Sequence, residues 1–311
     1  MLALSTSCKS TETPSGRTLL RLLENFQISG LELDYRINQT VYAEIRQALQ
    51  HSRLKVVSIH NFFPIPPVAS TSGGGGDLFL LSHPDEEERI QAVEWTCRSI
   101  EHAHDLGARA VVLHCGLVDM DPELEILYHY YEKDQIYSGQ AQAFIRKKIK
   151  EREKKMGKHL DALLRSLDTL ARVAEKKEVL LGLENRYHYH ELPGMKEFAV
   201  LLQKLEGSPI GYWHDTGHAN TNEILTLLPP EALLKEYSDQ LIGIHFHDAI
   251  GLEDHLCPGS GEIEFNKIKP YLKPDTLLVV ELKPGTASAD ISEGINLLHR
   301  LGFDPEYAFD V

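Results

Sequence analysis

The chain lacks the features of membrane-spanning and disulfide-stabilised proteins. No apolar run in its 311 residues approaches the roughly 20 residues that a transmembrane helix needs, so no membrane span is predicted. The opening segment MLALSTSCKS has no basic n-region and is predicted to form a first strand rather than a secretion signal. Its four cysteines are scattered without a CxxC pair, a pattern that favours a reduced, cytoplasmic setting: Cys8, Cys97, Cys115 and Cys257.

Positive charge is also scarce. Lysine and arginine total 32 against 46 aspartate and glutamate residues, which gives a formal net charge of −14. A surface of that sign repels phosphate backbones and argues against nucleic acid as a partner. Histidine, in contrast, occurs 16 times. Many of these histidines lie beside predicted strand ends, where an imidazole can bind metal or move protons.

Short apolar runs alternate with helical patterns along most of the chain. Because the runs are continuous rather than alternating, they indicate parallel strands covered on both faces. Eight such runs in about 300 residues favour an α/β fold that closes into a single (β/α)8 TIM barrel, treated as one domain over residues 1–311. The predicted strands are Leu2–Ser5, Leu31–Asp34, Val56–His60, Ala110–His114, Val179–Glu184, Ile210–His214, Leu241–Phe246 and Leu277–Glu281.

Helices are predicted between these strands. The clearest follows Asp85, carries acidic residues in its first turn and ends at Gly107, which are the signals of a capped helix. The predicted ranges are Arg17–Asn25, Val41–His51, Glu86–Leu106, Lys158–Lys176, Met195–Leu205, Asn222–Leu228 and Ile291–Leu301.

Two segments interrupt the rhythm. Pro64–Ser82 is rich in proline, serine and glycine, and predicts a long loop after the third strand. Asp119–Gly157 is far longer than an ordinary βα loop and is interpreted as an insertion after strand four that could shape the substrate pocket. It contains the basic run Lys147–Lys155, for which a solvated helix face is the favoured interpretation.

Ionisable residues stand at the ends of consecutive predicted strands. Active sites of (β/α)8 barrels lie at this C-terminal face, and a charged group that closes an apolar strand needs a partner or a cation. Three carboxylates and one imidazole form a mostly oxygen-donor set that suits one divalent ion, Mn2+, Mg2+, Co2+ or Zn2+. The predicted metal ligands are Glu184, Asp215, His245 and Glu281.

Further side chains near these strand ends are predicted to contact substrate. His60 and His114 close strands three and four, and His218 lies three residues after Asp215. Arg186 could hold an anionic or hydroxylated group. His188 and His190 form an HxH pair for which a surface or pocket-rim position is favoured. Cys115 and Cys257 are interpreted as small apolar filler.

A series of short motifs resembles the xylose isomerase-like barrel superfamily, which contains sugar (phosphate) isomerases and epimerases together with endonuclease IV-type DNA repair enzymes. The resemblance covers nearly the whole chain, and the order of the motifs on successive strands makes it specific. The motifs are Ser58-Ile59-His60, Val112-Leu113-His114-Cys115-Gly116, Gly182-Leu183-Glu184-Asn185, His214-Asp215-Thr216-Gly217-His218, Gly243-Ile244-His245-Phe246-His247-Asp248, His255-Leu256-Cys257-Pro258-Gly259-Ser260-Gly261-Glu262-Ile263 and Val280-Glu281-Leu282-Lys283-Pro284.

The resemblance implies a metal-dependent enzyme. Residue by residue, it assigns the cation to the four ligands named above, and in the ketose 3-epimerase branch Glu184 and Glu281 would also exchange the substrate proton. This chain has His255 where that branch usually has arginine, which argues against an ordinary ketohexose epimerase. The complete set of predicted substrate contacts is His60, His114, Arg186, His218, His255 and Lys283.

Three functions remain open from the sequence. The favoured one is an isomerase or epimerase of a small sugar-like carbonyl compound, with proton removal alpha to a metal-bound carbonyl. The second is an endonuclease IV-like phosphodiester hydrolase with three zinc ions, for which the additional histidines, with Glu253 or Asp254, would serve as ligands. The third is a cyclitol lyase or dehydratase, since barrels host many reactions. Assembly into a homo-oligomer is an open expectation.

Overall fold

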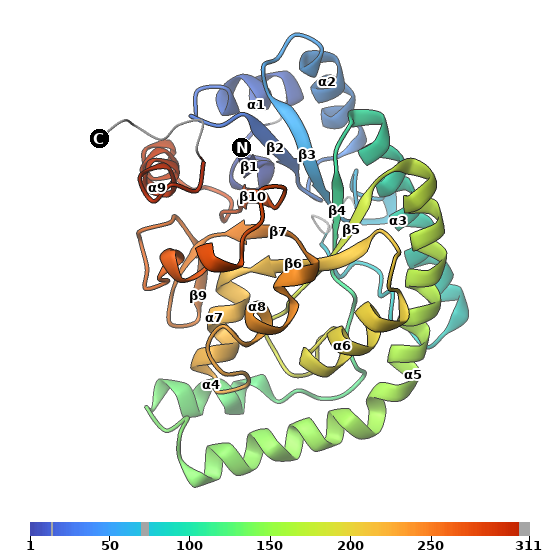
Figure 1. The fold of residues 1–311 in the computed structure, drawn as a ribbon, viewed down its shortest axis with the longest axis vertical. Helices are drawn as coiled ribbons and strands as arrows, with labels where there is room; N and C mark the ends of the chain where they lie inside the picture. Colours follow the sequence, from blue (N-terminus) through green and yellow to red (C-terminus); the bar gives the residue numbers. More distant parts are fainter. Residues whose placement is uncertain (14, 70–74, 305–311) are drawn as a thin grey trace.

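The computed structural model describes residues 1–13, 15–69 and 75–304. Residues 70–74 of the expected Pro64–Ser82 loop and the last seven residues of the chain lie outside this range. Eight parallel strands form a closed barrel in the order β1-β10-β7-β6-β5-β4-β3-β2 (Figure 1). They are β1 (Leu2–Ser5), β2 (Gly30–Leu33), β3 (Lys55–His60), β4 (Ala110–Leu113), β5 (Leu180–Glu184), β6 (Ile210–Asp215), β7 (Leu241–Phe246) and β10 (Leu277–Val280). The predicted (β/α)8 barrel is therefore confirmed.

Helices surround the barrel, and short 3-10 turns fill several connections. The helices are α1 (Gly16–Leu23), α2 (Gln39–Leu49), α3 (Glu86–Leu106), α4 (Leu124–Glu132), α5 (Gly139–Lys177), α6 (Met195–Lys204), α7 (Thr216–Ile224), α8 (Ala232–Tyr237) and α9 (Ser288–Arg300). The 3-10 turns are Thr6–Cys8, Pro67–Ala69, Ser238–Gln240, Phe265–Lys267 and Lys269–Tyr271. Within the described ranges no helix is both long and apolar enough to cross a bilayer.

The capping signals explain where the best-predicted helix begins and ends. At the start of α3 the Asp85 side chain accepts hydrogen bonds from the backbone N–H groups of Glu87 and Glu88. At its end Gly107 has φ of 69°, the left-handed conformation that glycine adopts without a Cβ penalty. This helix spans the predicted Glu86–Leu106 residue for residue.

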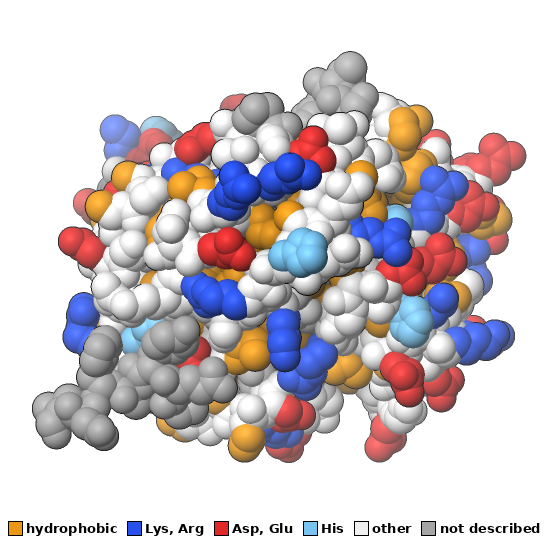
Figure 2. All heavy atoms as spheres, turned by 90° about the horizontal axis from the view of Figure 1, so that it is seen from above, with side chains coloured by type: hydrophobic (Ala, Val, Ile, Leu, Met, Phe, Trp, Pro, Cys, Tyr) orange, Lys and Arg blue, Asp and Glu red, His pale blue; other side chains and the backbone are white. Residues whose placement is uncertain are grey.

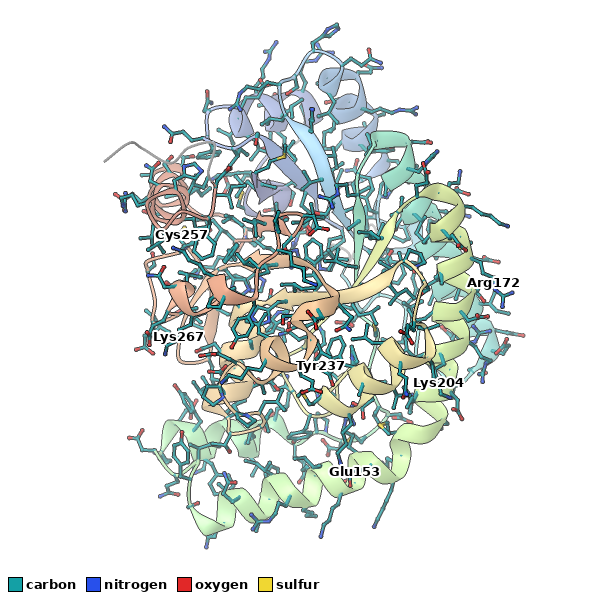
Figure 3. The ribbon with its side chains drawn as sticks, in the orientation of Figure 1. Glu153, Arg172, Lys204, Tyr237, Cys257 and Lys267 are labelled. Atoms are coloured by element: carbon teal, nitrogen blue, oxygen red, sulfur yellow. The ribbon has the colours of Figure 1, made fainter. Side chains whose placement is uncertain are left out.

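The insertion is helical and continuous with the helix that follows it. The predicted helix Lys158–Lys176 is only the second half of α5, which has 39 residues and begins at Gly139 behind the Ser138 cap. In Figure 1 α5 runs along the lower edge of the molecule and then up its right side, and Figure 3 labels Glu153 on the first limb and Arg172 on the second. The first limb and α4 form a satellite hydrophobic cluster around Leu127 and Ile145.

Most of the basic run on α5 is solvated, as its composition predicts, since Lys147, Lys150, Lys154 and Lys155 are exposed, but two of its side chains are not. Lys148 and Arg152 are buried. Lys148 pairs with Glu123, and Arg152 Nη2 lies 2.7 Å from Glu197 Oε2. These two side chains are buried where the insertion packs against neighbouring segments, and each is paired there with a carboxylate.

Two other elements depart from the prediction. Helix α7 begins at Thr216, not at Asn222, because the Asp215 side chain caps it by accepting from His218 N at 2.7 Å. After β7 the chain forms a two-stranded antiparallel hairpin, β8 (Asp248–Ile250) and β9 (Glu253–Leu256), which the strand pattern did not predict.

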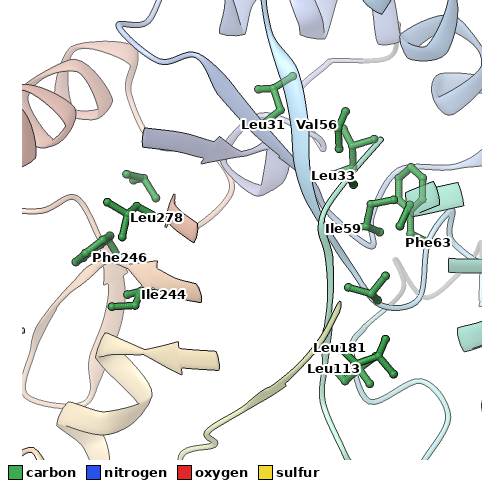
Figure 4. Close-up of a cluster of buried hydrophobic side chains, with 14 of the residues drawn as sticks. Leu31, Leu33, Val56, Ile59, Phe63, Leu113, Leu181, Ile244, Phe246 and Leu278 are labelled. Carbon is green, nitrogen blue, oxygen red and sulfur yellow. The ribbon is translucent and has the colours of Figure 1, made fainter. Parts of the chain in front are cut away.

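The hydrophobic core has two parts, one on each face of the barrel wall. Outward-facing side chains such as Leu31, Ile59, Leu181, Ile244 and Leu278 fill the space between strands and helices (Figure 4). A smaller cluster contains the inward-facing Ala3, Val57, Ala110, Val112, Trp213, Leu277 and Val279. On the face drawn in Figure 2, basic and acidic side chains are interspersed.

Trp213 is the largest member of the inner cluster. Its ring occupies the barrel axis so fully that a Cβ on Gly182 would come within 2.7 Å of it, and one on Gly243 closer still. Glycine is therefore required at these two positions of β5 and β7, because any side chain there would clash with the indole. The indole closes the barrel beneath the C-terminal mouth.

Candidate metal centre and active-site cavity

The two-residue period of the strands decides which strand-end residues enter the barrel. On β6, Trp213 and Asp215 share the inward row, whereas Tyr212 packs with the outer core. His214 faces the same outer side and hydrogen-bonds the Tyr212 hydroxyl. The same alternation brings Glu184, His245 and Glu281 inward at the ends of their strands.

The structure brings the four predicted metal ligands together. Glu184, Asp215, His245 and Glu281 each offer a donor atom, and these atoms all lie within 4.8 Å of one another. His245 Nδ1 lies 2.8 Å from Glu184 Oε1 and 3.0 Å from Glu281 Oε2, with Asp215 Oδ2 at 3.8 Å. All four residues are buried, with exposures of 0–5%.

The electrostatics of this cluster favour a positive charge at its centre. Burial acts most strongly, to raise the pKa of Glu184 and Glu281, but His245 and the neighbouring histidines together outweigh it and lower both well below the ordinary value. Burial likewise acts to lower the pKa of His245, but Glu32, Glu281 and Glu184 raise it well above the ordinary value. Carboxylates packed this closely need a compensating cation, and a hard divalent ion matches three oxygen donors and one nitrogen. The donor set therefore fits the predicted metal.

A cavity of about 410 Å³ opens above the cluster. Glu184 and Glu281 line it, while Asp215 and His245 lie beneath. Five of the predicted substrate contacts also line the cavity: His60, His114, Arg186, His218 and His255. Lys283 does not; its side chain is half exposed, with Nζ 2.7 Å from Glu253 Oε1.

His60 and His114 form a second group of possible ligands that shares Glu184 with the first. Glu184 Oε2 lies 2.8 Å from His114 Nε2 and 3.6 Å from His60 Nε2. The other His114 nitrogen, Nδ1, is 3.0 Å from Asp77 Oδ2. Burial and Arg186 act to lower the pKa of His114, but Asp77 and Glu184 outweigh them and raise it to about 9.

Asp215, His247 and His255 form a third such group, but its hydrogen bonds leave His247 unsuited to bind an ion. His247 Nδ1 accepts from the backbone N–H of His255 at 2.9 Å. A neutral His247 ring must then carry its proton on Nε2, where it donates to Asp215, 2.9 Å from each oxygen. In this tautomer Nε2 carries the proton and the lone pair of Nδ1 accepts from His255, so neither nitrogen is free for a cation, and His247 orients the Asp215 carboxylate.

The histidines at the cavity wall differ in charge. His218 Nδ1 donates to the backbone carbonyl of Asn185 at 2.8 Å, and burial lowers the pKa of His218 to about 4. It is neutral at pH 7, with Nε2 as the remaining acceptor. Burial acts to lower the pKa of His255, but Asp254 and Glu281 raise it to about 9.

Arg186 is already paired with acidic groups. Its Nη2 donates to Asp77 Oδ2 at 2.8 Å and to Glu191 Oε1 at 3.1 Å, and its Nη1 lies 4.0 Å from Glu184 Oε2 and touches His114. Glu191 also accepts from the backbone N–H of His188 at 2.8 Å. Nη2 is thus hydrogen-bonded to two carboxylates of the cavity wall, and a contact between Arg186 and substrate stays a prediction.

Several residues of the site were missed by the sequence interpretation. Glu32 on β2 lies behind His245, Asp77 reaches the mouth from the β3–α3 connection, and Tyr35 and Tyr187 line the cavity. Glu32 had a usable signal, since it is a lone charge inside the apolar run Gly30-Leu31-Glu32-Leu33. Asp77 follows a glycine-rich segment, and no sequence pattern there indicates that it would reach the site.

The cysteines and the HxH pair have supporting positions. Cys115 and Cys257 are buried free thiols, and burial raises the pKa of Cys257 to about 11, as expected of apolar filler. His188 hydrogen-bonds the Tyr128 hydroxyl of α4 at 2.7 Å, so it joins the insertion to the loop that carries Arg186.

Fold and site together define a class: (β/α)8 barrels with a carboxylate–imidazole cluster at the C-terminal mouth. The chain belongs to the xylose isomerase-like TIM barrel family, whose model matches residues 20–301. The predicted superfamily resemblance is therefore confirmed. A relative of Methanocaldococcus jannaschii, the uncharacterised protein MJ1614, is 31% identical over 209 residues, which cover 67% of each chain.

Solved structures with the same fold include sugar epimerases. A D-tagatose 3-epimerase-like protein superposes with a TM-score of 0.68 at 18% identity and covers 99% of this chain and 97% of its own. The 3-keto-D-glucoside 4-epimerase YcjR from E. coli gives 0.67 at 15%, covering 96% and 98%. The IOLI protein with bound zinc gives 0.63 at 13%, covering 100% and 99%. At these identities the likeness establishes the fold.

Proposed function

We propose that this protein is a divalent-metal-dependent isomerase or epimerase of a sugar or related polyol carbonyl compound. The observation that carries the proposal is the convergence of Glu184 and Glu281 on one imidazole nitrogen, His245 Nδ1, at 2.8 and 3.0 Å, while both also line the cavity. Two carboxylates at one cation, both open to substrate, are what a two-base proton transfer requires.

The four buried donors would hold the ion, as Mn2+, Mg2+, Co2+ or Zn2+. When bound, such an ion polarises a substrate carbonyl as a Lewis acid and makes the neighbouring C–H more acidic. Asp215 is pre-oriented for this by the His247 ring and by the N-terminus of α7. The buried setting of the cluster limits access of water.

Glu184 and Glu281 would exchange the substrate proton. Their lowered pKa keeps both ionised, so either can remove a proton from carbon, and the other then returns one to the opposite face or to the neighbouring carbon. His218 offers a neutral acceptor to a substrate hydroxyl, and His255 offers a charged donor to a developing oxyanion.

The charge of the cavity supports an uncharged substrate. Among the described lining residues Arg186 is the one arginine or lysine, and it is bound to Asp77 and Glu191. A volume of about 410 Å³ accommodates a small sugar-like molecule. The D-tagatose 3-epimerase-like protein and the 3-keto-D-glucoside 4-epimerase carry sugar-epimerase names, which agree with this substrate class.

Deuterium exchange tests the proposal directly. The wild-type protein, loaded with Mn2+, is incubated in D2O with a panel of unphosphorylated ketopentoses, ketohexoses and 3-ketoglycosides, and uptake at carbon is followed by NMR. We expect cation-dependent uptake that falls by about 10²–10⁴-fold in Glu281→Gln. Glu206→Gln, the same change at an exposed glutamate that precedes β6 at the opposite end of the barrel, serves as the matched control. Unchanged exchange in Glu281→Gln would remove that residue from the mechanism.

A second candidate is phosphodiester hydrolysis, which the His60, His114 and Glu184 group favours. Because Glu184 is shared, two ions could sit side by side as hydrolytic sites require. The bound Arg186 and the net charge of −14 argue against a polyanionic substrate. Elemental analysis separates the two candidates: two or three zinc ions per chain with cleavage of an abasic oligonucleotide supports the hydrolase, and one ion supports the isomerase. A cyclitol dehydratase would share the proton removal but release water, which NMR of the product detects.

A further inference from the structure

We infer that Glu32 is a positioning residue that fixes the tautomer of His245, so that Nδ1 is the bare nitrogen facing the cation. This inference rests on the proposed metal site. It concerns a residue of β2 that is not one of the four ligands and does not line the cavity.

The two nitrogens of His245 face different groups. Nδ1 points at the carboxylates of Glu184 and Glu281, and Nε2 lies 3.0 Å from Glu32 Oε2. A neutral imidazole carries one proton, and a cation can bind only the nitrogen without it. A carboxylate at Nε2 accepts a hydrogen bond and keeps the proton there, which leaves Nδ1 bare.

Packing fixes the plane of the His245 ring, so only the proton position is left to choose. The ring lies edge-on to Trp213 with centroids 5.0 Å apart, and it stacks against His60 at 5.8 Å with an interplanar angle of 13°. With the ring held in this way, the identity of the group at Nε2 determines the tautomer. Ser58 Oγ donates to the same Glu32 Oε2 at 2.8 Å and so orients that carboxylate.

Stability alone does not account for a carboxylate at this position. Glu32 is fully buried, and its Oε1 has no hydrogen-bond partner among the described residues. A buried carboxylate with an unsatisfied oxygen destabilises a fold. The Glu32 carboxylate lies instead beside His245, the one imidazole among the four predicted ligands. A carboxylate that accepts a hydrogen bond from a metal-binding histidine strengthens metal binding.

The test compares cation affinity in three proteins. Mn2+ is titrated into a Trp95→Phe background, in which Trp213, 5.0 Å from His245, is the sole tryptophan and its fluorescence reports binding. Glu32→Gln should bind Mn2+ about 10–100-fold more weakly than the parent. Glu197→Gln, the same change at a buried glutamate paired with Arg152, should lose stability but keep the parent's affinity.

A second variant and a spectroscopic readout guard against misfolding and against a purely electrostatic effect. Ser58→Ala leaves the carboxylate in place but removes one of its donors, and should weaken Mn2+ binding less than Glu32→Gln does. In the parent with Zn2+, ¹H–¹⁵N correlation should show the His245 proton on Nε2. In Glu32→Gln at the same Zn2+ concentration that signal should weaken or broaden, because chains that have lost the ion no longer have the proton fixed on Nε2.

The outcomes separate this inference from the proposed function. If the parent binds Mn2+ and Glu32→Gln binds it within two-fold, or if the His245 proton remains on Nε2 in that variant, Glu32 does not position the ring. If Glu197→Gln loses as much affinity as Glu32→Gln, the effect is one of general stability and the inference is again overturned. If the parent itself binds no divalent ion, the metal-dependent function fails.

Discussion

The two ends of the barrel interior are built from the same strands and have opposite chemistry. Towards the N-terminal end, the inward side chains are apolar and include Ala110, Trp213 and Val279. One or two strand positions further along, the inward side chains are Glu32, Asp215, His245 and their neighbours, all buried. The comparison shows that the height of an inward residue along its strand decides whether its side chain packs in the core or contributes to the site. The lower layer stabilises the fold, and the upper layer concentrates charge that a cation would relieve.

The strongest expected effect on stability belongs to the lower layer. Trp213→Ala would leave a large void at the barrel axis, and we expect a loss of about 3–5 kcal/mol in the free energy of unfolding. Because the indole packs among the apolar side chains of the inner cluster, the loss should be similar at pH 6 and pH 8. Urea unfolding followed by circular dichroism measures it. A loss below 1 kcal/mol would mean that the inner cluster does not hold the barrel closed.

A somewhat smaller effect is expected when the charge of the upper layer is compensated. Mn2+ at 100 times its Kd should stabilise the protein by about 2.7 kcal/mol, because the ion binds the folded chain. Thermal unfolding with and without Mn2+, and after removal of Mn2+ with EDTA, gives this difference. Asp215→Asn should abolish the Mn2+ response, and Trp213→Phe should retain most of it. Equal stabilisation of Asp215→Asn would place the ion elsewhere.

The smallest expected effect comes from the wall of the mouth and depends on pH. Burial acts to raise the pKa of Glu191, but Arg186 and His188 outweigh it and lower it to about 2. A lowered pKa in the folded state adds stability above the ordinary value of 4.5, and that stability is lost as pH falls from about 4.5 towards 2. We expect the free energy of unfolding of the wild type to exceed that of Glu191→Gln by roughly 1–3 kcal/mol at pH 7. At pH 3 the two free energies of unfolding, measured by urea unfolding, should approach each other. A gap that does not change with pH would contradict the Arg186–Glu191 pairing.

Much of the barrel follows from the sequence because its signals are local. Each of the eight strands is a short apolar run, and the predicted and observed ranges differ by at most one residue at either end. Helix α3 was predicted in full because its cap residues act within one turn. The long helix α5 was predicted only in part, since its first half is stabilised by packing against the loops of the mouth, which no local pattern records.

The site was predictable to the extent that strand ends converge in a barrel. Glu184, Asp215, His245 and Glu281 meet because parallel strands end at one face. Glu32 was missed because a charge between two leucines looks like the exposed face of an ordinary strand, although the inner face of a closed barrel is not exposed. Lys283 lies past the end of β10, where the strand alternation no longer applies, and the chain carries it out to Glu253.

The location of a bound ion tests the central claim most directly. Crystals of the protein grown with Mn2+ would be examined by anomalous scattering at the manganese edge. The account predicts a peak within coordination distance, about 2.0–2.3 Å, of the side chains of Glu184, Asp215, His245 and Glu281. A saturating Mn2+ concentration that leaves no peak among these four side chains, or that places the ion only at other residues, would contradict it.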